Sequence, residues 1–466
     1  MPDIAGSRRH TAIVVGASVS GLFAAAVLAD FADVTVIERD TLPAGPEARQ
    51  GVPQAHHAHL VWSGGVRAFE ELLPGFTDDV VARGGRLLHI MGDMVSRAPN
   101  EVWFRRFTST WHHNLVCSRN LLDHVLRERV LRDPRISLDE NAVVEGLVGD
   151  AGRVSGIRVR NGSGERTLCA DLVVDASGRG SRAPGWLEEL GLPRVTERQV
   201  DAGVAYATRL YRAPAATVGT FPIVNVQAVP SGAAPGRGGI ILPVEDGRWM
   251  VTLSGTRGGE PTKDADAFLD FAGGLADPVI GDLIKGAEPL GGIVTTRSTA
   301  NRRRYYEQMR SWPDGFAVLG DAIAGFNPVY GHGLTVAAQC AVALRTVLRS
   351  TAITAPGAAR RIQRAAARPV AGAWDLAVAQ DATYPGATDT PPTAVEKFLA
   401  RYVDRAVTTG ARNPTALGHL LDVMSLSRPA TRLFAPAMLL AMAFGPKAPH
   451  LPGPPLSAAE RENARL

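Results

Sequence analysis

The sequence predicts an α/β fold in which one α/β domain carries an inserted antiparallel sheet and is followed by a helical C-terminal region. Three stretches of the chain carry this prediction. Residues 11–38 have the pattern of a strand, a glycine turn, a helix and a second strand. Residues 316–348 contain a further strand, a glycine-rich loop and a buried helix. Between them, residues 200–255 alternate apolar and polar side chains, as antiparallel strands do.

The composition is that of a globular protein with a large core. The chain has 466 residues, enough for about three domains. Hydrophobic residues make up 45% of it, and the mean hydropathy is close to zero. The formal charge is only +4, and its basic residues are almost all arginines; the short run Arg302-Arg303-Arg304 is interpreted as a solvated or salt-bridged face. We therefore expect no nucleic-acid partner.

Cysteine usage and the chain ends indicate a cytoplasmic protein. Cys117, Cys169 and Cys340 are odd in number and far apart, which favours reduced thiols. Residues 1–10 lack the apolar core of a signal peptide. The uncharged apolar run 433–446 is too short to cross a bilayer, so no integral membrane segment is expected. A peripheral membrane contact stays open.

Residues 11–38 match the dinucleotide fingerprint of a Rossmann-like βαβ unit. Gly16 would make the tight turn after the first strand, and Gly21 would let the helix pack closely on it. Glu38 follows the second strand, where an acid hydrogen-bonds a ribose. Ser18 replaces the usual second glycine, and its hydroxyl could donate to a pyrophosphate. The alternative is an ordinary βαβ turn without a ligand.

Residues 320–333 form the second glycine-rich loop. This loop contains one acid (Asp321), one proline (Pro328) and four glycines between an apolar strand and an apolar helix. Such a loop lets the backbone approach a flat polar ligand closely. The free N–H groups of the helix that starts near Leu334 would point at the same ligand.

Further elements are expected between these two units. Three strands of a β-meander are expected over 136–148, 156–159 and 167–174, and a third strand–loop signal follows at Asp175–Ser181. The sheet of residues 200–255 ends in a hairpin turned at Glu245-Asp246-Gly247. Residues 264–284 are expected to be helical. After Ser350 the chain is Ala-rich and helical, with breaks at Pro385, Pro391-Pro392 and Pro414, and residues from Pro446 are expected to be loosely ordered.

Two polar features lie near the expected ligand. His56, His57 and His59 raise the possibility of a metal site, but no acid or cysteine completes one, so the interpretation is a loop lining a cleft and no metal is expected. Arg119 starts the helix expected over Asn120–Leu131, where the helix dipole disfavours a cation. An anionic partner such as phosphate explains this placement, and a plain surface arginine is the alternative.

Three motifs together resemble single-component FAD-dependent monooxygenases of the p-hydroxybenzoate hydroxylase fold. They are GASVSG at 16–21, DASGRGS at 175–181 and GDAIAGFNPVYGHG at 320–333, and the resemblance covers residues 10–350. The stretches at 48–65, 204–214 and 245–261 are further similar to the flavin epoxidases of polyether polyketide biosynthesis, of the lasalocid epoxidase type. The superfamily also includes tetronate-pathway flavoproteins that catalyse cyclisation without redox chemistry, and geranylgeranyl reductase-like enzymes.

The resemblance implies a set of FAD-binding residues. The ADP half would be held by Gly16, Ser18, Gly21, Glu38, Arg39 and Arg119. Asp321 would bind the ribityl or pyrophosphate region, and Pro328, Gly331, Gly333 and Leu334 would hold the flavin ring. Asp175 and Gly178 belong to a motif linked with FAD support and NAD(P)H use. Catalytic residues are not assigned, but Arg49, His57, Pro328 and His332 are expected near the ring. This chain departs from the family pattern at Ser18 and at His56.

The implied activity is an NAD(P)H- and O₂-dependent epoxidation of alkenes in a polyene or polyketide, which could be carrier-bound, through a flavin C4a-hydroperoxide. Only one dinucleotide fingerprint is present, which fits NAD(P)H as a transient reductant. An alkene needs no deprotonation, and neither a Ser/His/Asp device nor a carboxylate pair is found. Two alternatives remain: an FAD-bound non-redox cyclase of the [4+2] type, and a non-catalytic flavoprotein.

The same reasoning divides the chain into three parts. A discontinuous FAD-binding domain is expected from residues 1–65, 110–185 and 300–350. Residues 66–109 and 186–299 are expected to form the substrate-binding domain, and residues 351–466 the helical C-terminal region.

Overall fold

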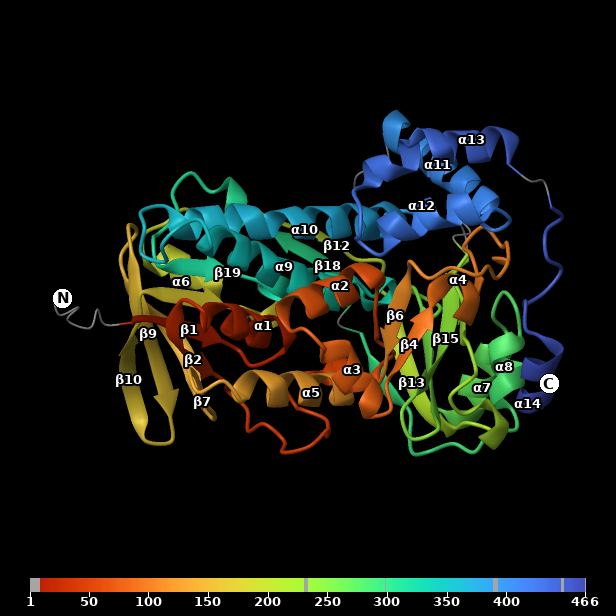
Figure 1. Cartoon of the computed structure of the whole chain (residues 1–466), viewed down its shortest axis with the longest axis horizontal. Coiled ribbons are helices and arrows are strands. Elements are labelled where there is room, and N and C mark those ends of the chain that lie inside the picture. Colours follow the sequence, from red (N-terminus) through yellow and green to blue (C-terminus); the bar gives the residue numbers. More distant parts are fainter. Residues whose placement is uncertain (1–8, 230–233, 298, 389–392, 446–447, 466) are drawn as a thin grey trace, which may run out of the picture.

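The computed structural model describes residues 9–229, 234–297, 299–388, 393–445 and 448–465. Its elements form an elongated molecule with an α/β half at one end and a second sheet at the other (Figure 1). The long helix α10 (Ala358–Asp381) runs along the α/β half toward a group of C-terminal helices. Residues 1–8, which belong to the polar N-terminus considered above, and the expected break at Pro391-Pro392 lie outside the described residues.

The α/β half contains a five-stranded parallel sheet, which includes the βαβ unit that the sequence predicts. Its strand order is β19-β11-β1-β2-β7. The strands are β1 (His10–Val15), β2 (Ala32–Ile37), β7 (Ile136–Asp139), β11 (Leu172–Asp175) and β19 (Phe316–Val318). Their side chains are almost wholly buried, because helices cover the sheet and parallel sheets are packed on both faces. The helices α1 (Val19–Leu28), α5 (Arg119–Leu131) and α10 contact its strands.

The β-meander is confirmed with two corrections. Strands β8 (Val143–Gly149), β9 (Val154–Asn161) and β10 (Gly164–Cys169) form it. The expected strands over 136–148 and 167–174 each cover two strands in different sheets, since β7 and β11 join the parallel sheet. The chain changes direction at Asn141, whose φ of 55° lies in the left-handed region that asparagine tolerates.

The second half is built on a six-stranded sheet of order β17-β13-β16-β15-β14-β5. These strands are β5 (Met94–Arg97), β13 (Ala205–Arg212), β14 (Ile223–Val226), β15 (Arg237–Val244), β16 (Arg248–Gly255) and β17 (Val294–Thr296). The predicted hairpin β15–β16 is confirmed: Asp246 and Gly247 have φ of 61° and 62°. The expected helix over 264–284 is two helices, α7 (Ala265–Gly273) and α8 (Val279–Ile284), because Pro278 starts the second one.

Two three-stranded sheets lie between the halves. One consists of β3 (Leu60–Val61), β6 (His113–Val116) and β4 (Arg86–His89), and the other of β12 (Glu197–Val200), β18 (Asn301–Arg304) and β20 (Ala324–Gly325). Helices α2 (Ser63–Leu72) and α3 (Phe76–Ala82) place Phe69 and Phe76 beside Phe23 in the core of the α/β half. The short helix α4 (Ile90–Asp93) follows β4.

The C-terminal region is helical, as predicted. It continues from α9 (His332–Leu348) through α10, α11 (Ala394–Gly410), α12 (Pro414–Met424), α13 (Pro436–Phe444) and α14 (Ala458–Ala464). The expectation of loose order after Pro446 is wrong for residues 448–465. Leu456 and Ala464 are buried in the core of the second half, and Glu460 pairs with Arg106 at 2.6 Å.

Candidate functional site

The parallel sheet brings the three predicted loops to one edge. Val15, the last residue of β1, pairs with Asp175 in β11, and Asp175 pairs with Val318 in β19. The chain leaves all three strands at this carboxyl edge, into the loops at 16–21, 175–181 and 320–333. Ligands of open α/β sheets bind at this edge.

The first loop has the glycine geometry that a dinucleotide fingerprint requires. Gly16 has a φ of +99°, and a Cβ there would lie 2.9 Å from the carbonyl oxygen of Ala176. A Cβ on Gly21 would lie 1.8 Å from the carbonyl oxygen of Gly16, so only glycine lets α1 approach the turn. Both glycines are therefore set by the backbone, and the loop leaves the first N–H groups of α1 without helical partners.

Arg119 lies at this helix terminus, where the sequence places an anionic partner. Its Nη2 donates to Ser18 Oγ at 3.1 Å, and its Nε donates to Asp123 at 2.7 Å. Arg119 is buried. Arg119 thus directs guanidinium N–H groups to the N-terminus of α1, and its ion pair with Asp123 offsets part of its charge.

Glu38 and Arg49 form a buried ion pair against the same loop. Arg49 Nη2 lies 2.8 Å from Glu38 Oε2, and Arg49 Nη1 donates to the carbonyl oxygen of Ala17 at 2.9 Å. The amide of Ala17 also donates to Glu38 at 2.9 Å. Arg49, which the sequence predicts near a flavin ring together with His57, pairs with Glu38, and each side chain neutralises the other's buried charge. Arg39 is exposed and lies 3.9 Å from Asp40.

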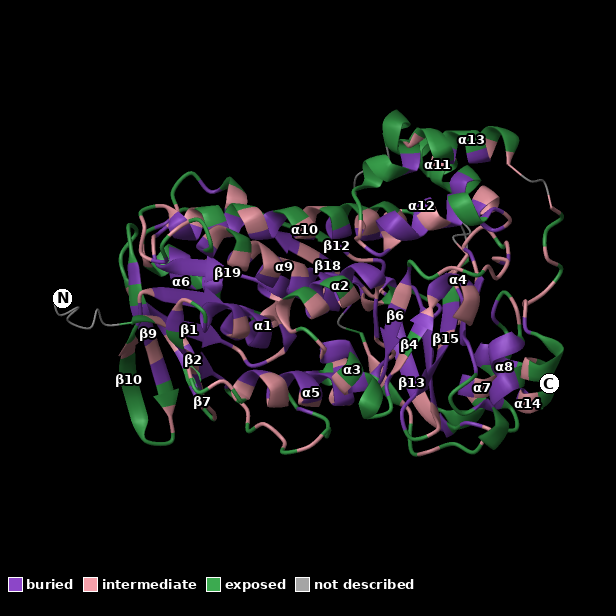
Figure 2. Cartoon of the chain, in the orientation of Figure 1, coloured by how far each residue is buried: buried purple, intermediate pink, exposed green. Residues whose placement is uncertain are grey.

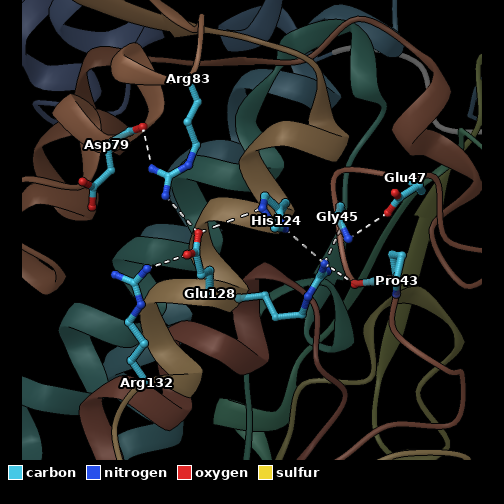
Figure 3. A network of polar contacts seen from close by, with 9 residues as sticks. Pro43, Gly45, Glu47, Asp79, Arg83, His124, Glu128 and Arg132 are labelled. Atoms are coloured by element: carbon cyan, nitrogen blue, oxygen red, sulfur yellow. Dashed lines mark hydrogen bonds and ion pairs between the residues drawn. The ribbon is translucent and has the colours of Figure 1, made fainter.

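A network of polar contacts holds the loop that precedes Arg49 (Figure 3). Arg127 of α5 donates to the carbonyl oxygens of Pro43 and Gly45. The network continues through His124 to Glu128, which accepts from Arg83 of the α3–β4 segment at 2.9 Å and also pairs with Arg132. These contacts fix residues 43–47 against α5, and with them the position of Arg49.

Asp175 of the second loop is fully buried and serves the loop itself. Its carboxylate accepts from the amide of Ser177 at 2.9 Å and from the hydroxyls of Ser177 and Ser181 at 2.5 Å. Burial raises the pKa of this carboxyl, and the two serines offset part of the rise. Asp175 therefore shapes the turn, and Gly178, with a φ of +79°, completes it.

Arg179 joins the second loop to the third, and sequence reasoning missed it. Its Nη1 donates to the carbonyl oxygen of Phe326 at 3.0 Å, and its Nη2 donates to Ala300. It contacts Gly325, where a Cβ would lie 2.9 Å from Arg179 Nη1. The signal in the sequence was a basic residue inside a glycine turn, which alone does not indicate this partner.

Asp321 of the third loop keeps its carboxylate free. It is half-buried, and among the described residues no hydrogen-bond partner for it is found. Burial raises the pKa of the Asp321 carboxyl, and the charges of Arg179 and Arg119 offset part of that rise. An unpaired acid between two arginines, at the edge where three loops meet, is suited to accept hydrogen bonds from ligand hydroxyls.

The third loop ends in a fixed turn before α9. Gly331 has a φ of +66°, and a Cβ there would lie 2.9 Å from Nε1 of Trp62, which donates to the carbonyl oxygen of Tyr330 at 2.9 Å. The backbone at Gly331, Gly333 and Leu334 thus forms the N-terminus of α9. His332 points elsewhere: its Nε2 lies 3.0 Å from the carbonyl oxygen of Met424. His332, one of the candidates expected near the flavin ring, therefore links α9 to the end of α12.

A buried polar network behind Pro328 was not predicted. Asn327 Oδ1 accepts from the Tyr206 hydroxyl at 2.6 Å, and Asn327 Nδ2 donates to Asp381, the last residue of α10, at 3.0 Å. Asp381 also accepts from Asn301 at 2.5 Å and from the Tyr330 hydroxyl. Burial raises the pKa of Asp381. The C-terminal helix α10 therefore sets the shape of the third loop.

A cavity of about 160 Å³ adjoins the third loop. It lies between one face of the six-stranded sheet and the ends of α10 and α12. Its lining is mostly apolar, and it includes His57, Ala58, Leu60, Trp62, Met94, Val204, Tyr206, Ile240, Leu242, Thr252, Pro328, Val329, Tyr330, Gly331, Asp381, Tyr384 and Met424. Pro328 and Gly331 thus belong both to the predicted cofactor loop and to the cavity wall.

His57 lies in this wall at the end of a hydrogen-bonded relay. The amide of Ala58 donates to Thr252 at 2.9 Å, the hydroxyls of Thr252 and Thr208 are 2.6 Å apart, and Thr208 lies 2.8 Å from His57 Nδ1. If each hydroxyl donates to the next group, both hydroxyl protons are used and Nδ1 accepts. The proton is then assigned to Nε2, which is buried without a partner. Burial and His56 lower the pKa of His57 to about 4, so the ring is neutral.

The three histidines do not form a metal centre. His56 is exposed, and His59 Nδ1 lies 2.8 Å from the carbonyl oxygen of His57. Within the described ranges, no group of three or more His, Cys, Asp or Glu side chains could hold a metal ion.

The free groups fit a dinucleotide with a flat ring. The N-terminus of α1 with Arg119 matches a pyrophosphate, the carboxylate of Asp321 matches hydroxyls, and the Ser20 hydroxyl, buried without a partner, lies against Gly320 at the same edge. Fold and site thus define a dinucleotide-binding α/β protein of the p-hydroxybenzoate hydroxylase type. More particularly, the chain belongs to the FAD-binding monooxygenase family: the family described as "FAD binding domain" matches residues 9–371.

The chain is also similar to individual proteins. The chain is 33% identical over 402 residues to Protein Rv3254 of Mycobacterium tuberculosis, which covers 83% of both chains. Among solved structures it resembles the flavin-dependent brominase Bmp2, with a TM-score of 0.62 at 15% identity, covering 90% of this chain and 93% of that one. The p-nitrophenol 4-monooxygenase PnpA from Pseudomonas putida has a TM-score of 0.62 at 15% identity, covering 90% and 99%. At these identities the structures show a shared fold.

Proposed function

We propose that this protein is an FAD-dependent monooxygenase that epoxidises alkenes of a long, largely apolar polyene or polyketide. One observation carries the proposal: the loop assigned to the flavin ring, Pro328 to Gly331, forms part of the wall of the apolar cavity. A substrate in that cavity would lie directly against the ring. The apolar lining favours a hydrocarbon chain over a charged aromatic acid.

We propose the following roles for the first two loops. The N-terminus of α1, with Gly16, Ser18 and Gly21, and Arg119 bind the FAD pyrophosphate. Glu38 accepts from the adenosine ribose and is oriented for this by Arg49 and by the amide of Ala17. Arg39 is exposed next to this acid and covers the adenine.

The third loop would hold the flavin half. Asp321 accepts from the ribityl chain, Pro328 packs against the ring, and the amides of Gly331, Gly333 and Leu334 at the start of α9 stabilise negative charge at the ring's pyrimidine edge. Asp175 and Gly178 support this site by shaping the second loop. NAD(P)H acts as a transient reductant, since a single dinucleotide fingerprint is present.

FAD supplies the redox chemistry with oxygen, and this chain orients the alkene and excludes water. The neutral ring of His57 would donate from Nε2 to an oxygen of the substrate and so fix which double bond lies over the flavin. Tyr206 and Tyr330 are held by Asn327 and Asp381, which keeps the opposite wall rigid.

The test combines isotope labelling with oxygen exclusion. The purified holoprotein is given NADPH, oxygen-18 gas and a linear triene methyl ester, and the product is analysed by mass spectrometry. One labelled oxygen atom per epoxide is expected. Turnover of NADPH and triene without label in the product would overturn the proposal. Product formed anaerobically without NADPH and without a mass change would instead establish the non-redox cyclase.

A further inference from the structure

The helical unit of residues 393–445 leaves part of its apolar surface uncovered. In α11, apolar residues recur on one helix face. The C-terminal half of that face packs inward, with Ala406 fully buried. In the N-terminal half the same face is open, and Val395, Phe398, Leu399 and Val403 are 67%, 64%, 39% and 40% exposed. This half of α11 therefore presents an amphipathic stripe to its surroundings.

Helix α13 and the turn before it continue this surface. Residues 433–445 contain no charged side chain. Met438 and Ala441 face inward, but Leu439, Leu440 and Phe444 are 46%, 59% and 83% exposed. Phe434, 47% exposed, stacks on Tyr402 of α11 with ring centroids 4.8 Å apart. This stack joins the two helices, and Figure 2 shows both as largely exposed.

We call the exposed apolar residues of α11, α13 and Phe434 the apolar patch. Eight of the fifteen large hydrophobic residues exposed in the described part of the chain lie in it. Exposed apolar surface gathered in this way marks an interaction site. The apolar patch stands on the most outlying helices of the molecule (Figure 1).

The charges beside the apolar patch select the partner. Residues 393–445 contain six Lys or Arg and three Asp or Glu, so this unit holds most of the +4 formal charge of the chain. On α11 itself, Lys397, Arg401 and Arg405 are exposed together with the acids Glu396 and Asp404, so the basic residues exceed the acidic ones by one. A second copy meeting the apolar patch would bring like charges together, whereas an anionic surface would be attracted. The apolar patch offers almost no hydrogen-bonding side chain, which a lipid surface does not need.

We propose that α11 and α13 dock this protein on a bilayer that contains anionic lipids. The helices lie in the interface, with the apolar patch among the acyl chains and the basic residues at the headgroups. Within the described residues no helix is long and apolar enough to cross a membrane, which agrees with a surface mode of binding.

The helices that carry the apolar patch lie close to the cavity. Helix α12 packs against both α11 and α13, and its last residue, Met424, lines the cavity. Its Leu417 and Leu421 pack on Ile90 and Met91 of the short helix α4. Docking would thus bring an apolar ligand of the bilayer close to the α12 wall. This inference goes beyond the proposed function and does not depend on it.

The test is sedimentation of the full-length protein with vesicles. Vesicles of phosphatidylcholine alone are compared with vesicles holding 30 mol% phosphatidylglycerol (about a third of the lipid, enough for a clear surface potential). The variant Phe398→Ser/Phe444→Ser removes two exposed rings from the apolar patch. The matched control, Val143→Ser/Val218→Ser, removes exposed apolar side chains of 40% and 50% exposure elsewhere. Circular dichroism melts establish that each variant folds.

The wild-type protein and the control should sediment with the anionic vesicles, and added salt should weaken this binding. The Phe398/Phe444 variant should bind at least about tenfold more weakly, since two buried rings contribute well over the roughly 1.4 kcal/mol that tenfold represents. Equal sedimentation with both vesicle types, or with neither, overturns the proposal. It is also overturned if light scattering finds a wild-type dimer that the Phe398/Phe444 substitutions convert to a monomer.

Discussion

At the scale of single residues, the site is distinguished by polar groups that have no partner among the described residues. Asp321 is the clearest of these, because Asp175, the acid of the neighbouring loop, uses both of its oxygens on Ser177 and Ser181. Two acids at one sheet edge thus differ in what they can do. One is committed to the fold, and the other is available to a ligand.

The first prediction concerns Asp321. Asp321→Ala should lose the yellow colour of bound FAD, because a charge-assisted hydrogen bond contributes about 1.5–3 kcal/mol, or roughly 10- to 100-fold in affinity. Asp321→Asn keeps the shape of the side chain but loses its charge. It should bind FAD more weakly than the wild-type protein and more tightly than the alanine variant. FAD occupancy is measured by absorbance after gel filtration. Full occupancy in the alanine variant would show that Asp321 does not contact the cofactor.

The second prediction concerns the pair of Glu38 and Arg49. Their side chains are 7% and 5% exposed, so removing one partner leaves the other buried and charged. Each of Glu38→Gln and Arg49→Met should cost about 3 kcal/mol of unfolding free energy, and the double variant should cost less than the two together. Urea unfolding of the three variants measures the coupling energy between the two side chains. Additive losses would contradict the pairing.

At the scale of elements, the strands and loops that hold the site follow from local sequence. The β1 turn, the strand before Asp175 and the loop at 320–333 were all predictable, since each depends on a short apolar run followed by glycines. The partners of Asn327 and Arg179 were not. Asn327 meets Asp381, and Arg179 meets Phe326, across long stretches of chain. No periodicity in the sequence relates residues that meet only in the folded molecule.

The third prediction concerns the contact between α1 and its turn. Gly21→Ala should unfold at lower denaturant and lose FAD, because the added Cβ would lie 1.8 Å from a backbone oxygen and the helix must move. Gly372→Ala is the matched control: it lies in α10 with no atom within 4 Å of the added Cβ. This control should gain about 0.5–1 kcal/mol of stability from helix propensity. A Gly21→Ala variant as stable as the wild type would contradict the close approach.

At the scale of the whole molecule, the cavity depends on segments that the sequence places far apart. One wall is the face of the six-stranded sheet, and the other comes from the ends of α10 and α12 in the C-terminal region. The sequence predicted a helical C-terminal region but not that it closes the cavity. Apolar helix faces do not encode which surface they cover, and this limits what the sequence says about the substrate.

Buried histidines near the cavity, including one where α9 meets α12, make the stability of the molecule depend on pH. His332 ties α9 to α12, and burial lowers its pKa to about 4. Its Nδ1 is buried without a partner, so a proton there would gain no hydrogen bond. In the unfolded chain the same ring has a pKa of about 6.5. At a pH between these two pKa values, His332 binds a proton in the unfolded state but not in the folded state. The free energy of unfolding therefore decreases as the pH falls below about 6.5, and the contribution of His332 is fully present above that pH.

The fourth prediction gives the magnitude of this pH dependence. Between pH 7.5 and pH 5, His332 should account for a loss of about 2 kcal/mol in the free energy of unfolding. His332→Gln keeps a donor for Met424 but does not titrate, so its stability should fall less over the same range, measured by urea unfolding at each pH. Burial also lowers the pKa values of His57 and His59. Part of the slope of unfolding free energy against pH therefore remains in that variant. An unchanged slope would show that His332 is solvated in the native state, and that α12 does not seal the cavity at this end.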